Sequence, residues 1–273
     1  LLGILSAKFS DGRDAIGKFV LIGDYKQLPA VVLQSDDDAI VCDNTLRELG
    51  FESLKKSFFE RLYTKYKNSD CSYCIDMLCR QGRMHPMVEA FPNEEFYEGK
   101  LIPVGLPHQL ENINNAMNFI PSQRDIDSIS GKSNKYEAKI VADIVQKLFF
   151  ELGDRFVPSL SIGVITPYRS QIAMIRKEIH DLDIPQLDEI SVDTVERYQG
   201  SQRDIIYSFS VNYLYQLKML PNIIEENGNL IDRKLNVVLT RSRRRIYITG
   251  VEDILRNNVI YRNLIDYIKG TTL

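Results

Sequence analysis

The chain has 273 residues, of which 44% are hydrophobic and 26% are charged, and its formal net charge is -3. This length allows one large or two ordinary domains, each with its own core. No apolar run is long enough to span a membrane, so we expect a soluble globular protein with no membrane partner. The slightly acidic total argues against a protein that coats nucleic acid with a broad basic face.

The four cysteines are Cys42, Cys71, Cys74 and Cys79. In a chain this large, these four cysteines do not look like a disulfide framework. We therefore expect a reducing, cytoplasmic location. Cys71 and Cys74 have the spacing of zinc ligands, and Cys79 and His85 follow nearby. The later spacing matches no strong zinc pattern, so we predict no metal site and ordinary buried thiols.

The N-terminal part is expected to hold a helix, a turn and an apolar strand at 19–22, which ends at Gly23 and Asp24. Helices should follow at 45–49 and 54–66. An apolar strand before a small-residue turn is how parallel sheets of α/β folds present functional groups at their carboxyl ends.

The rest of the chain alternates apolar strands with helices. A helix should begin near Pro86, and Ser133 is the expected N-cap of a long helix that ends at Glu151. We predict strands at 75–79, 118–120, 160–165 and 246–249, and helices at 87–96, 133–151, 172–180 and 235–240. Strand, turn and helix should repeat at 190–200 and at 204–211. This alternation predicts an α/β fold with a mainly parallel sheet and helices on both faces.

The stretch 233–245 contains six basic residues and no acidic residue, so a narrow basic cleft can exist within a nearly neutral total. Arg241 is placed at the C-terminal end of the predicted helix 235–240, between that helix and the strand that follows. A guanidinium held there is suited to binding phosphate oxygens. For residues 243–245, the alternative is that cations simply favour a helix C-terminus.

Five turns at strand ends carry polar groups, and each turn alone has an ordinary structural explanation. Gln27 can be a turn residue with no partner, and Arg83 can be a surface charge. Thr166 and Tyr168 can cap the next helix, and Gly200 can supply a positive φ. Their order, however, resembles the second half of a superfamily 1 helicase motor. The branch is the one that includes the RNA helicase of nonsense-mediated decay and related DNA helicase-nucleases. The stretches that carry the resemblance are 23–29, 80–86, 166–168, 192–204 and 235–241.

The resemblance spans nearly the whole chain and implies two RecA-like regions, with 1–78 as the end of the first domain and 79–273 as the second domain. In this family ATP binds between two such domains, and the protein contributes positioning and charge neutralisation. Gln27 would sense the γ-phosphate or the attacking water, and Arg83 and Arg241 would act as arginine fingers. The resemblance also implies a catalytic role for Asp24, and nucleotide-binding roles for Gly23, Gly200 and Gln202.

Further matches imply contact with single-stranded DNA or RNA, or coupling of that strand to the ATP cleft. They are Thr166, Pro167, Tyr168, Asp193 and Thr194. Hydroxyls and backbone amides suit a motor that holds phosphates and sugars without reading sequence. Tyr168 can also stack on a base, although a tyrosine beside a helix start is as often packed.

Three positions depart from the family's pattern. Gly82 stands where an aromatic residue commonly stacks on adenine, Gln202 replaces a glutamate that commonly holds the ribose, and Ala30 replaces a proline. The first two substitutions keep open the alternative of a degenerate helicase-like domain that only binds nucleic acid or protein.

The chain also contains no phosphate-binding loop and no Asp-Glu pair before the third motif. We therefore expect a C-terminal fragment that does not hydrolyse ATP alone. Its partner would be the N-terminal RecA-like half of the same polypeptide, which would hold the Mg²⁺ ligands that ATP requires.

Overall fold

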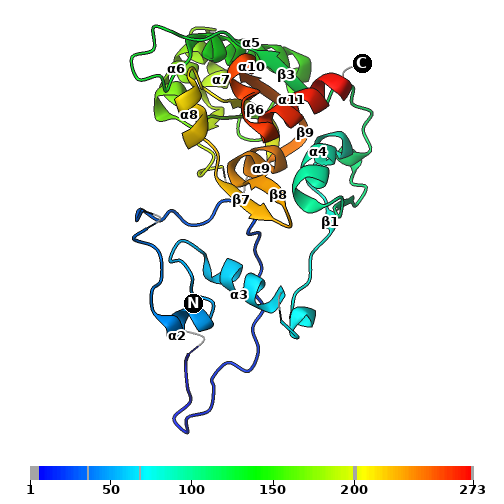
Figure 1. Ribbon diagram of the computed structural model, residues 1–273. Coiled ribbons are helices and arrows are strands. Elements are labelled where there is room, and N and C mark those ends of the chain that lie inside the picture. Colours follow the sequence, from blue (N-terminus) through cyan, green and yellow to red (C-terminus); the bar gives the residue numbers. More distant parts are fainter. Residues whose placement is uncertain (1–5, 36, 68, 199–201, 272–273) are drawn as a thin grey trace. The chain divides into compact units, whose positions relative to one another are not determined.

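The computed structural model describes residues 6–35, 37–67, 69–198 and 202–271 (Figure 1). The chain forms two compact units. The first comprises Leu1–Tyr25 and Pro29–Asp76, and the second comprises Lys26–Leu28 and Met77–Leu273. Within the described ranges, no helix has the length and apolar character needed to cross a membrane.

The first unit is largely loop, with helices α2 (Asn44–Glu48) and α3 (Phe58–Lys67) and a short 3-10 turn at Ser72–Cys74. The strand expected at 19–22 is wrong, because these residues have no ladder partner among the described residues. Phe19, Val20 and Ile22 are exposed to solvent, Ile22 at 85%, and Leu21 is partly exposed. Apolar composition alone does not make a strand, since a strand also needs a neighbouring backbone to pair with.

The second unit is built on a five-stranded sheet in which every neighbouring pair is parallel. This arrangement confirms the α/β fold predicted from the alternating pattern. In spatial order the strands are β3 (Met117–Pro121), β9 (Ser242–Gly250), β6 (Arg203–Ser208), β4 (Ile162–Ile165) and β5 (Ser191–Asp193).

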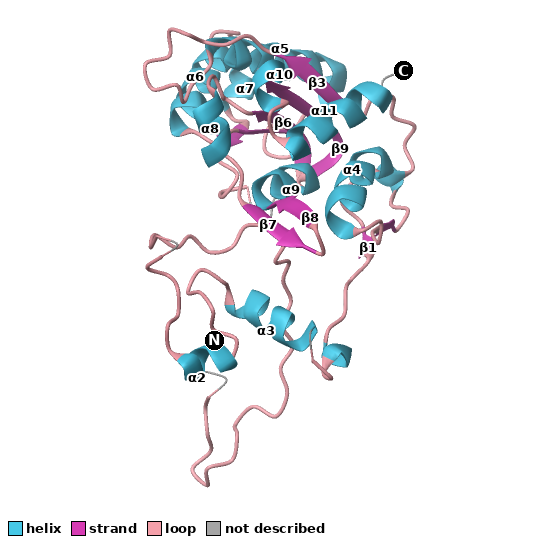
Figure 2. Cartoon of the chain, viewed as in Figure 1, coloured by secondary structure: helices cyan, strands magenta, loops and turns pink. Residues whose placement is uncertain are grey.

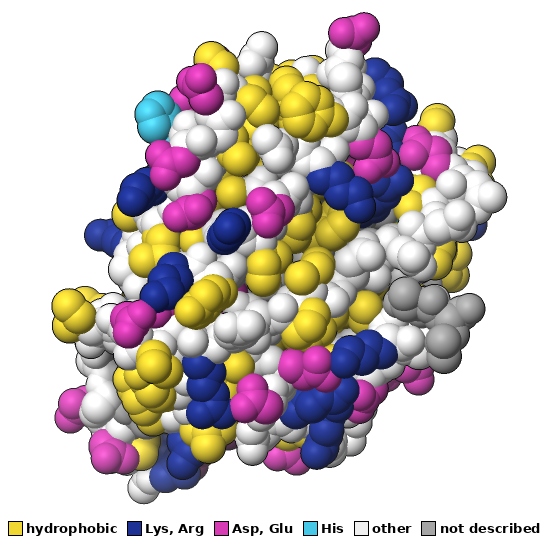
Figure 3. Space-filling view, turned by 90° about the horizontal axis from the view of Figure 1, so that it is seen from above, with side chains coloured by type: hydrophobic (Ala, Val, Ile, Leu, Met, Phe, Trp, Pro, Cys, Tyr) yellow, Lys and Arg dark blue, Asp and Glu magenta, His cyan; other side chains and the backbone are white. Residues whose placement is uncertain are grey.

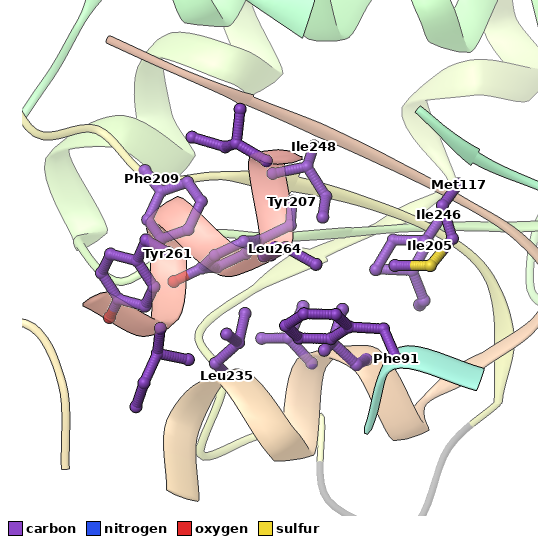
Figure 4. Close-up of a cluster of buried hydrophobic side chains, with 14 of the residues drawn as sticks. Phe91, Met117, Ile205, Tyr207, Phe209, Leu235, Ile246, Ile248, Tyr261 and Leu264 are labelled. Atoms are coloured by element: carbon purple, nitrogen blue, oxygen red, sulfur yellow. The ribbon is translucent and has the colours of Figure 1, made fainter. Parts of the chain in front are cut away.

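Helices cover both faces of this sheet, as Figure 2 shows. Strand β6 shows the division, because Ile205 and Tyr207 belong to one apolar cluster and Ile206 to the other. The first cluster (Figure 4) includes side chains of α4 (Pro86–Tyr97), α8 (Leu214–Met219), α9 (Arg233–Thr240), α10 (Glu252–Leu255) and α11 (Val259–Thr271). The second includes those of α5 (Lys135–Leu152), α6 (Arg169–His180) and α7 (Pro185–Asp188).

Two small sheets complete the second unit. Strand β1 (Arg80–Gln81) pairs with β2 (Ile102–Pro103). The strand expected at 75–79 is not found there, because pairing starts only at Arg80. Strands β7 (Ile223–Glu226) and β8 (Asn229–Asp232) form a hairpin. Its Asn-Gly turn has φ values of 53° and 82°, the left-handed pair that tight hairpins require.

Several helix starts differ from the sequence-based expectation by one to four residues, and α5 and α3 are two examples. Helix α5 is capped by Asn134 and not by Ser133, because the Asn134 side chain accepts hydrogen bonds from the amides of Tyr136 and Glu137. Helix α3 begins four residues later than expected, at Phe58. Helix ends depend on local side-chain geometry, which apolar spacing does not reveal.

Candidate nucleotide and nucleic-acid site

Helix α9 positions Arg241. Asp232 caps the helix by accepting a 3.0 Å hydrogen bond from the amide of Lys234, and the apolar side of the helix is buried against the sheet. Arg241 is the C-cap, only 4% exposed, and strand β9 starts at the next residue. This confirms that Arg241 lies between helix and sheet.

Gln27 meets Arg241 directly: Arg241 Nη2 donates a 2.6 Å hydrogen bond to Gln27 Oε1. Both residues belong to the second unit. The segment around Gln27 is fixed by Asn236 on α9, whose Nδ2 donates to the carbonyl of Lys26 and to the Tyr97 hydroxyl, each at 2.9 Å. We call these two hydrogen bonds the Asn236 clip. Asn236 is fully buried, so the clip is shielded from water.

Lys26 provides a second attachment for the same segment, and no sequence pattern had singled it out. Its ammonium group donates to the carbonyl of Phe96 at 2.8 Å and lies 2.9 Å from a Glu226 carboxylate oxygen on β7. Lys26 is 8% exposed. The hairpin therefore supplies the counter-charge that permits burial of this lysine.

Arg83 reaches the same place from the loop after β1. Its Nη1 donates a 3.1 Å hydrogen bond to the carbonyl of Thr240, the residue before Arg241. The backbone of Arg83 is held by Gln81 and His108, at 2.9 Å each. Burial lowers the pKa of Arg83, which means that its guanidinium is partly stripped of water.

Gly23 and Asp24 lie in the first unit, where both are exposed. A side chain at Gly23 would crowd the ring of Phe59, since an added Cβ would lie 3.3 Å from it. The roles expected for Gly23 and Asp24 stay predictions. Gln202 is exposed just before β6, and Gly200 lies outside the described residues.

The residues expected to contact nucleic acid follow two neighbouring strands. β4 and β5 are paired, and the Thr166 amide donates to the Asp193 carbonyl at 3.1 Å. Asp193 in turn accepts a 2.8 Å hydrogen bond from the amide of Thr194. Pro167 and Tyr168 are half-buried at the start of α6, and Tyr168 is its N-cap without a side-chain capping bond.

Thr166 is completely buried, and its hydroxyl lies 3.0 Å from the Ser210 hydroxyl. The expectation that this hydroxyl contacts nucleic acid directly is therefore wrong. The other role implied by the resemblance, coupling of the nucleic acid to the ATP cleft, stays a prediction for Thr166.

A buried polar cluster lies behind Thr166, and the sequence-based reasoning missed it. Ser210 Oγ is 3.1 Å from Ser208 Oγ, which donates at 2.7 Å to Glu137 Oε2, and the Ser210 amide donates to the same oxygen at 2.9 Å. Burial raises the pKa of Glu137 to about 7, and the donated hydrogen bonds only partly offset this effect. Gln171 on α6 joins the cluster through Ser208.

The basic stretch 233–245 is not a uniformly positive surface. Arg244 makes a bidentate pair with Glu111, at 2.8 Å for both hydrogen bonds, and Arg245 lies 2.5 Å from Glu151. Both arginines lie in β9, three and four residues beyond the C-cap Arg241, and not in the helix itself. Basic and acidic side chains are also interspersed on the face seen in Figure 3.

The cysteines are free, and none is buried: Cys42 and Cys74 are exposed, while Cys71 and Cys79 are partly exposed. The expectation of buried thiols is therefore wrong. Among the residues that the structure describes, no cluster of three or more His, Cys, Asp or Glu side chains is arranged to hold a metal ion.

Residues 54–253 match the family described as an AAA domain. The chain is 29% identical over 276 residues to an uncharacterized ATP-dependent helicase of Methanocaldococcus jannaschii, covering 93% of this chain and 35% of the relative. It is 27% identical over 265 residues to the DNA polymerase alpha-associated DNA helicase A of Saccharomyces cerevisiae, covering 88% of this chain and 35% of the relative.

A third relative is the regulator of nonsense transcripts 1 of Dictyostelium discoideum, which is 30% identical over 268 residues. That alignment covers 92% of this chain and 18% of the relative. The chain thus spans 35% or less of the length of these three relatives. With its turn motifs in family order and a parallel sheet behind them, the chain belongs to this AAA domain family, within the superfamily 1 helicases.

Proposed function

We propose that the chain is the C-terminal motor part of an ATP-dependent DNA or RNA helicase. Residues 79–273 would form its second RecA-like domain, and residues 1–78 the end of the first. The observation that carries this proposal is the meeting of Gln27, Arg83 and Arg241 at the end of α9. An amide and two guanidinium groups in one place are the donors that a triphosphate tail needs.

In this role the two arginines neutralise charge that develops on the transferred phosphoryl group. Their guanidinium groups are pre-positioned, by Gln27 in one case and by the carbonyl of Thr240 in the other. Pre-positioned donors lose little energy to reorganisation, which is the main source of electrostatic catalysis. Gln27 orients the attacking water or senses the γ-phosphate, and its bond to Arg241 links that sensing to α9.

ATP and Mg²⁺ would be bound by the complete helicase. The phosphate-binding loop and the Mg²⁺ ligands would come from the N-terminal RecA-like half of the same polypeptide, which is the proposed intramolecular partner. Magnesium would supply charge neutralisation at the phosphate oxygens. Within this chain, Gln27, Arg83 and Arg241 contribute amide and guanidinium groups only.

Single-stranded nucleic acid would pass over the carboxyl ends of β4 and β5. The supporting observation is that Thr166 and Asp193 are joined through their backbones, so the two strand ends form one continuous edge. Tyr168 and Thr194 lie on that edge and are only partly buried. A cytoplasmic location stays part of the proposal.

ATP turnover tests the proposal. The complete protein should hydrolyse ATP, and single strands should stimulate it, whereas the 273-residue chain alone should show no turnover. Gln27→Ala and Arg83→Ala should each lower turnover in the complete protein without abolishing ATP binding. Absence of turnover in a folded complete protein that binds single strands would refute the motor function.

One observation favours the alternative, a helicase-like domain that binds nucleic acid or protein without turning over ATP. Where an aromatic ring commonly stacks on adenine, Gly82 is packed close to Leu106 and Val104. A Cβ built on Gly82 would lie 3.0 Å from Leu106 Cδ1 and 3.3 Å from Val104 Cγ2. The aromatic platform is thus replaced by aliphatic groups, and the ATP turnover measurement distinguishes the two functions.

A further inference from the structure

Two tyrosines near the nucleic-acid edge form an ordered aromatic surface. Tyr213 and Tyr215 stack with ring centroids 5.7 Å apart and an angle of 11° between the ring planes. Tyr215 is 58% exposed, so one face of the pair is open to solvent. Tyr168 joins this surface through residues 131–132, because Lys132 lies beside the Tyr168 ring and Gly131 lies beside the Tyr215 hydroxyl. We call these three residues the tyrosine platform.

The platform is held by a buried polar frame at the start of α8. Gln216 Oε1 accepts hydrogen bonds from the amides of Asn212 and Tyr213, at 2.9 and 3.0 Å, and Gln216 Nε2 donates to the Gly131 carbonyl at 2.5 Å. Gly131 has a φ of 64°, and a Cβ there would lie 3.1 Å from Tyr215 Oη. A glycine at 131 therefore lets the loop approach the Tyr215 ring closely. Because the tyrosines are already held in place, they lose little conformational entropy when a ligand binds.

The segments around the tyrosine platform contain basic residues and no acidic residue, while the buried Glu137 carboxyl group of α5 accepts a 2.9 Å hydrogen bond from the Ser210 amide. The three segments that form it, 128–134, 166–173 and 209–222, contain Lys132, Arg169 and Lys218 and no Asp or Glu. This is unusual for a chain whose net charge is -3. Lys132 Nζ lies 6.0 Å from the centroid of the Tyr168 ring, and the Lys132 carbonyl accepts a 2.6 Å hydrogen bond from Ser170.

We propose that the open face of Tyr215 stacks on a base of single-stranded nucleic acid, while Lys132 contacts a phosphate of the same strand. The rings of Tyr213 and Tyr215 already stack on each other, so the base lies on the outer face and not between them. Exposed aromatic faces combined with basic side chains are how proteins bind single strands without reading sequence. This inference rests on the strand edge proposed above and extends it from β4 and β5 to α8.

Binding of a fluorescent oligothymidylate to the 273-residue chain, measured by anisotropy, tests the platform. Tyr215→Ala should weaken binding by about tenfold or more, which is toward the low end of the range for losing one base–aromatic stack, and Tyr215→Phe should retain it. Phe150→Ala is the matched control, because Phe150 is also an exposed aromatic residue, 67% exposed, near the C-terminal end of α5. Lys132→Ala should reduce the salt dependence of binding by about one phosphate contact.

A direct readout comes from an oligonucleotide that carries 5-iodouracil, which crosslinks to a stacked aromatic ring on irradiation. Peptide mass spectrometry should place the crosslink on Tyr215. If the chain binds the oligonucleotide and Tyr215→Ala binds as tightly as the unsubstituted chain, the platform is overturned while the motor function stands. If the folded chain binds no single strand at all, the strand edge itself fails, and the platform fails with it.

Discussion

Arg241 Nη2 and Gln27 Oε1 are joined by a 2.6 Å hydrogen bond across 214 residues of sequence. The bond links the end of α9 to a three-residue segment that Asn236 and Lys26 attach to the second unit. It means that the residue expected to sense the γ-phosphate and one expected finger are positioned by each other. Substitution at either one should therefore disturb both.

Arg241→Ala in the complete protein should reduce ATP turnover by about 10³-fold or more, because an arginine finger contributes mainly to the transition state. Nucleotide affinity should change little. Steady-state turnover and titration with a fluorescent ATP analogue separate these effects. Arg262→Ala is the control, since Arg262 is an exposed arginine on α11. Unchanged turnover in Arg241→Ala would remove this residue from the catalytic site.

Asn236→Ala should destabilise the chain by about 1–3 kcal/mol, because it leaves the buried Lys26 carbonyl without its amide donor. It should also lower ATP turnover in the complete protein, since Gln27 loses the clip beside it. Chemical denaturation measures the free energy of unfolding. Asn263→Ala is the control: it removes an exposed 3.2 Å bond to Glu95 and should change stability by less than about 0.5 kcal/mol. Equal effects from both substitutions would contradict the clip.

Glu137 should make stability depend on pH. Burial raises its pKa from 4.5 to about 7, so between these values the native chain holds a proton that the unfolded chain has lost. The free energy of unfolding should therefore fall as pH rises through this window, by up to about 3 kcal/mol. Glu137→Gln, which cannot titrate, should flatten that fall.

The measurement is urea denaturation at pH 5.5 and pH 8 for both proteins. Glu94→Gln, which replaces an exposed carboxylate on α4, serves as the control and should keep the pH dependence of the unsubstituted chain. A Glu137→Gln protein with the same pH dependence as the unsubstituted chain would show that the buried carboxyl group does not titrate in this window.

Gly163→Ala should destabilise the second unit by about 1–3 kcal/mol through overpacking. A Cβ at Gly163 would lie 2.5 Å from Tyr198 Oη, and this hydroxyl donates a 2.8 Å hydrogen bond to the Ser191 carbonyl. Thermal unfolding measures the effect. In the matched control Gly270→Ala, the added methyl meets no atom within 4 Å, and alanine favours the helix. A stable Gly163→Ala protein would mean that the Tyr198 ring can move aside.

The sheet and α9 could be predicted from the sequence because β4, β6 and the second half of β9 contain continuous apolar runs, and α9 has apolar residues at helical spacing. The Asn227-Gly228 dipeptide is a strong hairpin signal, and it also predicts β7 and β8. The hairpin carries Glu226, which is the counter-charge of Lys26. The strand expected at 19–22 failed because pairing depends on a neighbouring backbone, which apolar composition does not reveal. Ser133 and Asn134 are adjacent capping residues, and only geometry decides between them.

For the site, the resemblance selected Gln27, Arg83 and Arg241, and the structure brings the three together. Their catalytic roles stay predictions. Glu137 could not be selected, because an acidic residue in the first turn of a helix is common and usually solvated. Its burial depends on Ser208 and Ser210, about 70 residues further along the chain.

The segment Lys26–Leu28 belongs to the second unit, although the residues on both sides of it belong to the first. The backbone therefore crosses between the units three times, and no single cut yields two intact halves. A truncated protein that starts at residue 79 would keep both candidate fingers but lack Gln27. A fragment cut at the apparent domain boundary would therefore lack the residue that is expected to sense the γ-phosphate. To restore that residue, residues 26–28 would have to be supplied as a separate peptide.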